Sequence, residues 1–404
     1  MNDSIAPPAR SATGRHAINL EIEYLRAIAV LLVVFAHADI MFPRSGIGQW
    51  TGVDLFFCIS GYVITRSFQD YFDEAIAEGR WWAATRAFWV RRIFRLAPSA
   101  WLWLAVMVLC SWGFNQTGWF GKLEDSLKTA GYFLLFATNF ALAHGDVRTN
   151  GFFWSLTLED QFYFVFPFFL FVFRRHWRWI VFLALIYLQS IPDRSIGTDP
   201  HPGYLWVTRL DALMWGCVIY LFSRSALYWK LEPIFCRYRI VALAINFALI
   251  YCLVEIPKGS FGYYIGYKGE SQIALTSAAL VFLASFDRGY VLPIPRVLQS
   301  VLAWIGGRSY GIYLIHIAMM GITKEIWLRA LPWFGENPPN QHYVYAAMLL
   351  VLVPLAAELN FRFVETPIRR MGVRIADRIL AKSRETSAVA QPPVAEPVPV
   401  RPVR

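Results

Sequence analysis

The chain has 404 residues, of which 57% are hydrophobic and only 16% are charged, with a formal net charge of +10. Soluble domains carry about 25% charged residues, so this composition argues against a soluble protein and favours one embedded in a bilayer. The basic residues form short runs between apolar segments, which is typical of cations that flank a membrane and argues against nucleic acid as a partner.

Eleven apolar segments follow one another along the chain and predict an all-α polytopic membrane protein. The first twenty residues are polar and basic and lack the apolar stretch of a cleavable signal peptide. A full crossing needs about 20 residues, so the segments 129–143 and 179–191 are short. The segments are 24–42, 52–68, 97–113, 129–143, 155–173, 179–191, 205–222, 240–256, 271–286, 303–323 and 343–361.

The basic residues indicate how segment 129–143 lies. With the N-terminus in the cytoplasm, the loop 69–96 is cytoplasmic. If 129–143 crosses the membrane, the later basic runs all lie outside; if it is a re-entrant or surface hairpin, they all lie inside, as the positive-inside rule prefers. We therefore predict about ten transmembrane helices in a bacterial inner membrane, with both termini cytoplasmic.

Three regions follow from this reading. Residues 1–20 form a cytoplasmic N-terminal segment, and residues 21–375 form the membrane domain. Residues 376–404 end in a Pro-, Val- and Ala-rich sequence without helical period, and we expect a disordered cytoplasmic tail.

Arg26 and His37 lie in the first predicted helix with ten apolar residues between them. Eleven helical steps make about three turns and rise about 16 Å, so both side chains face one side of the helix. Arg26 then lies near the cytoplasmic end and His37 in the outer half. A snorkelling arginine and a bonded core histidine are the structural alternative, but two such residues on one face are costly in lipid and favour a function.

Two further groups flank this helix. Asp54, at the outer start of the next apolar segment, is a candidate to orient His37, or alternatively a residue favoured by the helix dipole. Arg91, Arg92 and Arg95 precede Pro98, which we expect to open the third helix. Three guanidinium groups suit a phosphate-rich ligand, although these residues taken alone are better explained by ordinary positive-inside anchoring.

The sequence WSLTLEDQFY follows the predicted hairpin and places polar and aromatic residues at the outer mouth. Trp154, Ser155, Glu159 and Asp160 resemble a sugar site, because carboxylates accept bonds from hydroxyls and aromatic rings cover sugar faces; an interfacial aromatic belt is the alternative.

The remaining candidates come from the second half of the chain. Arg209 and Asp211 enter their helix from outside and pair with one another or with Glu159, either in a site or in a purely structural ion pair. Tyr310 and His316 lie toward the inner end and in the outer half of another helix. The two intramembrane histidines lack further ligands at suitable spacing, so no metal site is expected.

Taken in order, these pieces resemble the membrane acyltransferase family three, the O-acetyltransferases of bacterial surface polysaccharides. The resemblance covers about residues 20–375 and rests on the Arg26–His37 spacing and on the ordered sequences GVDLFFCISGY, RRIFRLAP, WSLTLEDQFY, RLDALMWG and SYGIYLIH. It implies ten membrane helices, acyl-CoA from the cytoplasm as co-substrate and, commonly, a glycan or lipid-linked sugar as acceptor. We expect the donor to be acetyl-CoA and expect no bound cofactor.

The resemblance also implies that Arg26 and His37 act on the donor. The family usually has two glutamates where this chain has Glu159 and Asp160, which shortens the reach of one carboxylate. Many relatives carry an additional hydrolase-like domain; in this chain we expect any second step to come from a partner, such as a polysaccharide-assembly protein.

The combined hypothesis is an O-acyltransferase of cell-envelope or exported polysaccharide. Acyl-CoA docks at the arginines, and the acceptor enters past Glu159 and Trp154. His37 acts as a general base or as a transient acyl carrier. A small-molecule acceptor, succinyl-CoA as donor, a sugar-lipid transporter and a non-catalytic assembly protein are the alternatives.

Reporter fusions test the hairpin at 129–143. We expect alkaline phosphatase fused after Trp177 to be inactive and GFP fused there to fluoresce, because this loop is cytoplasmic only if the hairpin does not cross. A phosphatase fused after Asn115 is the control and should be active. Active phosphatase after Trp177 would reject the hairpin.

Overall fold

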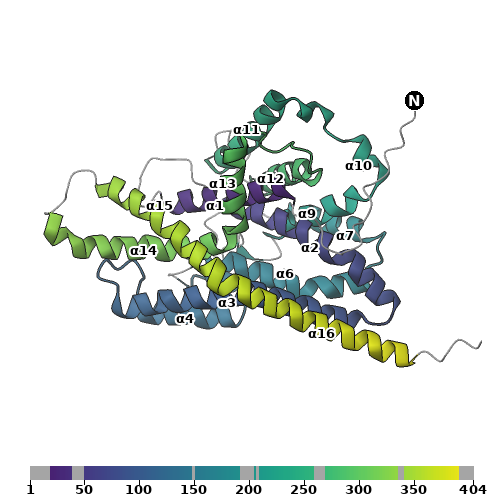
Figure 1. Cartoon of the computed structure of the whole chain (residues 1–404), viewed down its shortest axis with the longest axis horizontal. Helices are drawn as coiled ribbons and strands as arrows, with labels where there is room; N and C mark the ends of the chain where they lie inside the picture. The colour runs from purple at the N-terminus through teal and green to yellow at the C-terminus, as the bar shows by residue number, and fades with distance from the viewer. Residues whose placement is uncertain are drawn as a thin grey trace, which may run out of the picture.

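The computed structural model describes residues 19–38, 50–147, 151–191, 204–205, 209–258, 269–334 and 341–390, and every regular element in these ranges is helical (Figure 1). The elements are α1 (Leu20–Ala38), α2 (Gly52–Ala77), α3 (Trp81–Gly113), α4 (Leu123–Leu134), α5 (Thr138–Ala143), α6 (Phe153–Val172), α7 (Arg178–Gln189), α9 (Asp211–Ser223), α10 (Ala226–Lys230), η2 (Ile234–Arg237), α11 (Arg239–Glu255), η3 (Ile256–Lys258), α12 (Gly269–Ser285), α13 (Arg296–Gly307), α14 (Ser309–Phe334), α15 (Gln341–Asn360), η5 (Phe361–Glu365) and α16 (Thr366–Ala390).

The helical segments carry large apolar side chains on the outside of the molecule. Trp112, Leu135 and Ile240 are 74%, 76% and 83% exposed. Contact of these side chains with water is unfavourable, whereas contact with hydrocarbon is not. Among the described residues, four helical stretches are long and apolar enough to cross a membrane: 81–113, 153–172, 239–258 and 343–386. The predicted count of about ten crossings stays a prediction.

Two predicted boundaries were wrong. Residues 69–96 are not a loop, because α2 continues to Ala77 and α3 begins at Trp81, with Gly79 at φ +70° in the turn between them. Pro98 therefore lies inside α3, which at 33 residues is about 50 Å long. The predicted segment 303–323 is divided at Arg308 between α13 and α14.

Glycines bring helix backbones into direct contact. A Cβ atom at Gly61 of α2 would overlap the carbonyl oxygen of Leu213, and one at Gly216 of α9 would overlap the carbonyl oxygen of Cys58. At Gly306 of α13 it would overlap the carbonyl oxygen of Glu23 in α1. Small residues permit such close approach of helices, and here they fix α2 against α9 and α13 against α1.

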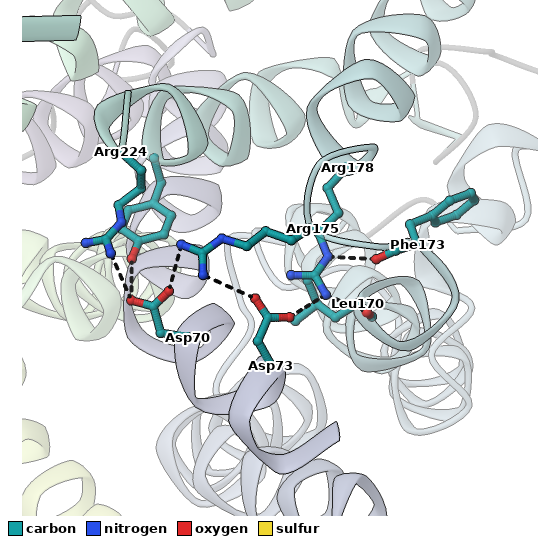
Figure 2. A network of polar contacts seen from close by, with 8 residues as sticks. Asp70, Asp73, Leu170, Phe173, Arg175, Arg178 and Arg224 are labelled. Atoms are coloured by element: carbon teal, nitrogen blue, oxygen red, sulfur yellow. Dashed lines mark hydrogen bonds and ion pairs between the residues drawn. The ribbon is translucent and has the colours of Figure 1, made fainter. Parts of the chain in front are cut away.

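Alternating charges join the ends of four helices (Figure 2). On α2, Asp70 lies 3.4 Å from Arg175 and 3.8 Å from Arg224, which follows α9. Asp73, one turn later, accepts a 2.6 Å bond from Arg178 at the start of α7. Arg178 also donates to the carbonyl oxygens of Leu170 and Phe173 at the end of α6. The ends of α2, α6 and α9 and the start of α7 therefore meet at one face.

This shared face agrees with the predicted hairpin. Because α2 and α6 both end at it, α6 begins at the side where α3 ends, and the chain between them returns to the side that it left. The break between α4 and α5 lies at Phe136, whose φ of 54° is rare for a residue with a side chain. Gln161 of α6 donates to the Phe136 carbonyl oxygen at 2.8 Å and so holds this turn.

The tail prediction was wrong for residues 376–390, which belong to α16. This helix is amphipathic and lies across α3 in Figure 1. Ala376 and Leu380 pack against Ala87, and Asp377 accepts a 2.6 Å bond from Arg91. The apolar face of α3 thus stabilises α16, a helix that the sequence alone did not indicate. Residues 1–18 and 391–404, which hold most of the predicted N-terminal segment and the end of the tail, lie outside the described residues.

Gly216→Ala tests the α2–α9 contact. We expect this variant to lose about 1–3 kcal/mol of stability, because the new methyl group meets backbone that cannot move aside. Thermal unfolding of the detergent-solubilised protein provides the measurement. Gly131→Ala in α4 is the control: its Cβ would meet no atom within 4 Å, so its melting temperature should be unchanged or higher. Equal melting temperatures for the two variants would contradict the contact.

Candidate functional site

A cavity of about 110 Å³ lies between α1, α2, α3, α6, α14 and α16. One wall is cationic, one side holds two carboxylates, and its far end is aromatic. The lining residues are Arg26, Val53, Phe56, Phe57, Ser60, Val63, Arg92, Arg95, Leu96, Ser155, Leu156, Glu159, Tyr163, Gly306, Gly307, Ser309, Tyr310, Tyr313, Glu365 and Arg369.

Most of the cationic wall forms no direct ion pair, although Glu159 and Glu365 of the same cavity attract it from a distance. Among the described residues, no carboxylate forms an ion pair with Arg92, Arg95 or Arg369; Arg26 is paired with Glu23 at 2.7 Å. The guanidinium groups of Arg26, Arg92 and Arg95 lie close enough to repel one another. Buried like charges are unfavourable unless something compensates them, so the wall is suited to an anion with several charges.

Aromatic rings hold Arg92 in place instead of an acid. Its guanidinium carbon lies 5.0 Å from the ring centre of Tyr163, 5.3 Å from that of Phe68 and 5.7 Å from that of Phe88. Cation–π contacts of this kind are attractive and leave the N–H donors unused. Arg92 is therefore positioned while its donors stay available for a ligand.

Glu159 lies in this cavity and not at an outer mouth as predicted. It is six residues into α6, about 9 Å beyond the start of the helix, and accepts a bond from the hydroxyl of Tyr163 one turn on. The second carboxylate, Glu365, ends the π-helix η5 and accepts a 2.8 Å bond from Asn360. Single π turns often occur at functional sites, and this one brings Glu365 and Arg369 to the cavity.

Tyr313 and Ser155 close the far end of the cavity. Their hydroxyl oxygens are 2.6 Å apart, and Tyr313 donates to the carbonyl oxygen of Phe152 at 3.0 Å. Tyr310, one turn earlier on α14, donates to the Leu96 carbonyl oxygen at 2.6 Å. One turn beyond Tyr313 on the same helix lies His316, outside the cavity.

His37 and His316 form a pair at this end. The Nδ1 atom of His37 lies 3.2 Å from Nε2 of His316, and the ring centres are 5.0 Å apart. His316 Nδ1 is 2.6 Å from the Tyr313 carbonyl oxygen, which can only accept, so Nδ1 carries the proton and Nε2 has the lone pair. His37 Nδ1 is 2.9 Å from the Val33 carbonyl oxygen and so also carries its proton.

These bonds fix the tautomers of both neutral rings. His37 Nδ1–H points to the Val33 carbonyl oxygen and to His316 Nε2, and the lone pair of His37 is therefore on Nε2. In a neutral histidine, the hydrogen bond made by one ring nitrogen decides whether the other nitrogen carries the proton or the lone pair. His37 Nε2 is thus available to take a proton or to attack a carbonyl carbon.

Asp54 does not contact His37, because it neutralises a buried arginine. Its carboxylate accepts a 2.9 Å bond from Arg209, and Glu270 of α12 pairs with the same guanidinium at 2.9 Å. Arg209 lies between the rings of Trp50 and Trp154, 4.6 Å and 5.7 Å from their centres. A buried guanidinium requires such compensation. Here the two compensating carboxylates come from α2 and α12.

Arg209 therefore has different partners from those predicted. It forms no direct ion pair with Glu159 or Asp211, although the charge of Asp211 also attracts it, and the Asp211 carboxylate accepts a 3.0 Å bond from the amide of Ala212 at the start of α9. Trp154 lies beside Arg209 and packs on Phe57 with 6.2 Å between ring centres. This buried ionic group joins α2, α9 and α12 near the start of α6.

The three consecutive polar residues of α6 point in different directions. Glu159 faces the cavity, Gln161 bonds to the α4–α5 turn and to Asn139, and Asp160 faces an apolar groove between α3, α6, α7 and α9. Each step along an α-helix turns by about 100°, so neighbours cannot share a site. The predicted sugar site of adjacent carboxylates is therefore divided.

The structure brings together Arg26, Arg92, Arg95, Ser155, Glu159 and Tyr310, and separately His37 with His316. Arg91 stands apart in its pair with Asp377. Sequence reasoning missed Arg369, Glu365, Tyr163 and Tyr313. Tyr163 lies one helical turn after Glu159 and Tyr313 one turn before His316, so helical spacing was a signal for both; Arg369 and Glu365 depend on how α16 folds back.

Several known proteins are similar to this chain in sequence. The profile of the acyltransferase domain (acyltransferase 3) matches residues 19–358. The chain is 28% identical over 375 residues to the peptidoglycan O-acetyltransferase OatA of Listeria monocytogenes, covering 87% of this chain and 56% of that protein. It is 27% identical over 386 residues to the putative peptidoglycan O-acetyltransferase YrhL of Bacillus subtilis, covering 91% and 57%.

A putative O-acetyltransferase of Staphylococcus aureus is 26% identical over 386 residues, covering 87% of this chain and 58% of that protein. The chain thus spans little more than half the length of these curated relatives. No solved structure matches it.

Proposed function

The chain belongs to the membrane acyltransferase family three, and on that premise we propose that it transfers an acetyl group from acetyl-CoA to a hydroxyl of a cell-envelope polysaccharide or its lipid-linked precursor. The names of the relatives support O-acetylation of such a polymer. One observation carries the proposal: an arginine-lined cavity and a histidine pair lie at the two ends of the contact between α1 and α14.

In the proposed reaction, the arginine cavity binds the acyl donor. Arg92, Arg95 and Arg369 form no direct ion pair among the described residues, although Glu159 and Glu365 line the same cavity, and the phosphates of CoA supply further negative charge. Arg26 lies beside them and is already paired with Glu23. The predicted cytoplasmic side of α3 would present this wall to the cellular pool of acyl-CoA.

The cavity is narrow in this structure. Its volume of about 110 Å³ is well below the roughly 300–1,000 Å³ of ligand pockets, so donor binding requires the surrounding helices to separate. Tyr313 and Ser155 lie between the cavity and the histidine pair. In the proposal, the pantetheine arm displaces this pair on its way to His37.

His37 carries out the proton transfer. Its bare Nε2 takes the proton of the acceptor hydroxyl while the oxygen attacks the thioester carbonyl carbon; the C–S bond then breaks and His37 returns the proton to the sulfur. His316 accepts the His37 Nδ1–H, which keeps Nε2 free and stabilises the ring once it is protonated. A transient acyl group on Nε2 is the alternative sequence of bonds.

Histidine variants test this mechanism in liposomes containing labelled acetyl-CoA and a crude envelope glycan fraction. We expect His37→Ala to lower label transfer by about 10²–10⁴-fold, because it removes the base. His316→Ala should lower kcat with little change in the KM for acetyl-CoA. The double variant should be no worse than His37→Ala, since the two rings act as a unit.

His144→Ala, at an exposed histidine, is the control and should match wild type. If the folded wild-type protein moves no label with any acyl donor, or if His37→Ala retains full activity, the proposal fails and sugar-lipid transport becomes the hypothesis to test.

Arginine variants test the donor end separately. We expect Arg92→Ala and Arg95→Ala each to raise the Kd for CoA about tenfold or more, because each removes charged hydrogen bonds to phosphate. Arg91→Ala is the matched control: its surface pair with Asp377 is worth about 0–1 kcal/mol, so the Kd should change less than about twofold. Equal losses at Arg91 and Arg92 would contradict a phosphate site in the cavity.

A further inference from the structure

The exposed face of α16 carries a row of cations. Four basic side chains follow one another at intervals of four residues, and all four are exposed: Arg370, Arg374, Arg378 and Lys382. Residues i and i+4 lie on the same face of an α-helix, so the four charges form a line about 18 Å long. We call these four residues the basic stripe of α16.

Within the described part of the chain, no residue of the basic stripe forms an ion pair. Asp377, which lies between the cations in sequence, is bonded to Arg91 of α3 at 2.6 Å. The other acid of the helix, Glu385, follows the last cation of the stripe and forms no ion pair in this part of the chain. Like charges four residues apart destabilise a helix, so the stripe contains three successive repulsive pairs that an external anion would relieve.

Apolar side chains lie beside these cations. Met371 and Val373 of α16 are 49% and 41% exposed, and on α3, which packs along α16, Trp82 and Ile93 are 45% and 51% exposed (Figure 1). Exposed apolar groups of this size are unfavourable in water but not at the boundary between lipid headgroups and acyl chains. The α3–α16 pair therefore combines cations with apolar surface, as helices at a membrane surface do.

The place of α16 in the chain also associates it with a membrane surface. The preceding helix, α15, has 20 residues, about the number that one crossing needs, and it belongs to a stretch that is apolar enough to span a membrane. The chain becomes basic directly after α15, in η5 and α16. The basic stripe therefore begins close to where the hydrocarbon ends, which is the level of lipid phosphates.

We propose that the basic stripe of α16 binds the phosphate groups of anionic phospholipids, such as phosphatidylglycerol. The cations donate hydrogen bonds to phosphate oxygens, and the acyl chains lie against Met371 and Val373. This lipid site goes beyond the proposed function and does not depend on it. Arg369, which precedes the stripe on the same helix, lines the arginine cavity, so bound lipid would also hold one wall of the candidate active site.

The arrangement of the stripe favours lipid over other anions. A soluble phosphate has no apolar part to cover Met371 and Val373, and one small anion cannot reach four cations spread over about 18 Å. At a membrane surface, phospholipid headgroups are the most concentrated anions, and each neighbouring Lys or Arg raises the affinity for anionic lipid about fivefold.

Hydrogen exchange of the full-length protein in lipid nanodiscs tests the proposal without requiring catalysis. The discs contain either phosphatidylcholine alone or an equal mixture of phosphatidylcholine and phosphatidylglycerol. We expect the amides of α16 to exchange at least about tenfold more slowly in the mixed discs, because bound lipid opposes local opening of the helix. The amides of α9, which is largely buried in protein, are the internal control and should exchange alike in both.

Two matched double variants separate lipid binding from helix stability. Arg374→Gln with Arg378→Gln should remove at least about fivefold of the lipid-dependent protection. Lys230→Gln with Arg296→Gln removes two exposed cations outside α16 and should change that protection less than about twofold. In phosphatidylcholine discs, α16 of the first variant should exchange as slowly as in wild type or more slowly, because like-charge repulsion is removed.

Equal exchange of wild-type α16 in the two kinds of disc would overturn the proposal and leave an acidic protein as the partner to test. Equal protection by inorganic phosphate added to phosphatidylcholine discs would overturn it as well, since a soluble anion would then be sufficient. Faster exchange of the first variant in phosphatidylcholine discs would show that the two arginines stabilise the helix itself, and this result too would contradict the lipid site.

Discussion

Hydrocarbon provides no partner for a charge, and the placement of the charged residues in this chain follows from that constraint. Arg209 shows the compensated case: Asp54 and Glu270 each bond to its guanidinium at 2.9 Å, and Trp50 and Trp154 cover its faces. Arg92 and Arg95 show the opposite case, since no described acid pairs with either. The first arrangement holds helices together, and the second keeps donors available for an anion that arrives later.

The close contact of α2 and α9 depends on glycine and positions both kinds of group. Gly61 and Gly216 let the two backbones touch, and this approach brings Asp54 of α2 within reach of Arg209 at the start of α9. At the other end of α2, Asp70 and Asp73 gather arginines from the ends of α6, α7 and α9. The two ionic groups therefore fix the tilt of α6, which carries Glu159 and Asp160 on different faces.

The proposed reaction needs two substrates that meet from different surroundings. In the proposed reaction, the arginine cavity binds the charged donor. The His37–His316 pair lies beyond Tyr313, where the cavity ends.

Local sequence patterns were sufficient to predict most helices and the face that two of the site residues share. The apolar segments identified most helices, because burying a backbone in lipid requires internal hydrogen bonds that a helix supplies. The placement of Arg26 and His37 on one face followed from helical spacing alone. The predicted tail and the loop 69–96 were wrong because α3 and α16 are amphipathic, and their stability comes from each other: Ala376 packs on Ala87 and Arg91 pairs with Asp377.

The sequence by itself determined the membrane class, the helical fold, the family and both residues of the histidine pair as candidates, because these depend on composition, helical period and ordered motifs. Only the tertiary structure decided which charges are neutralised and which are not. Asp54 faces Arg209 and His37 faces His316, 279 positions away along the chain. Partner choice depends on distances between helices far apart in sequence, and a one-residue step on α6 sends Glu159 and Asp160 to two different sites.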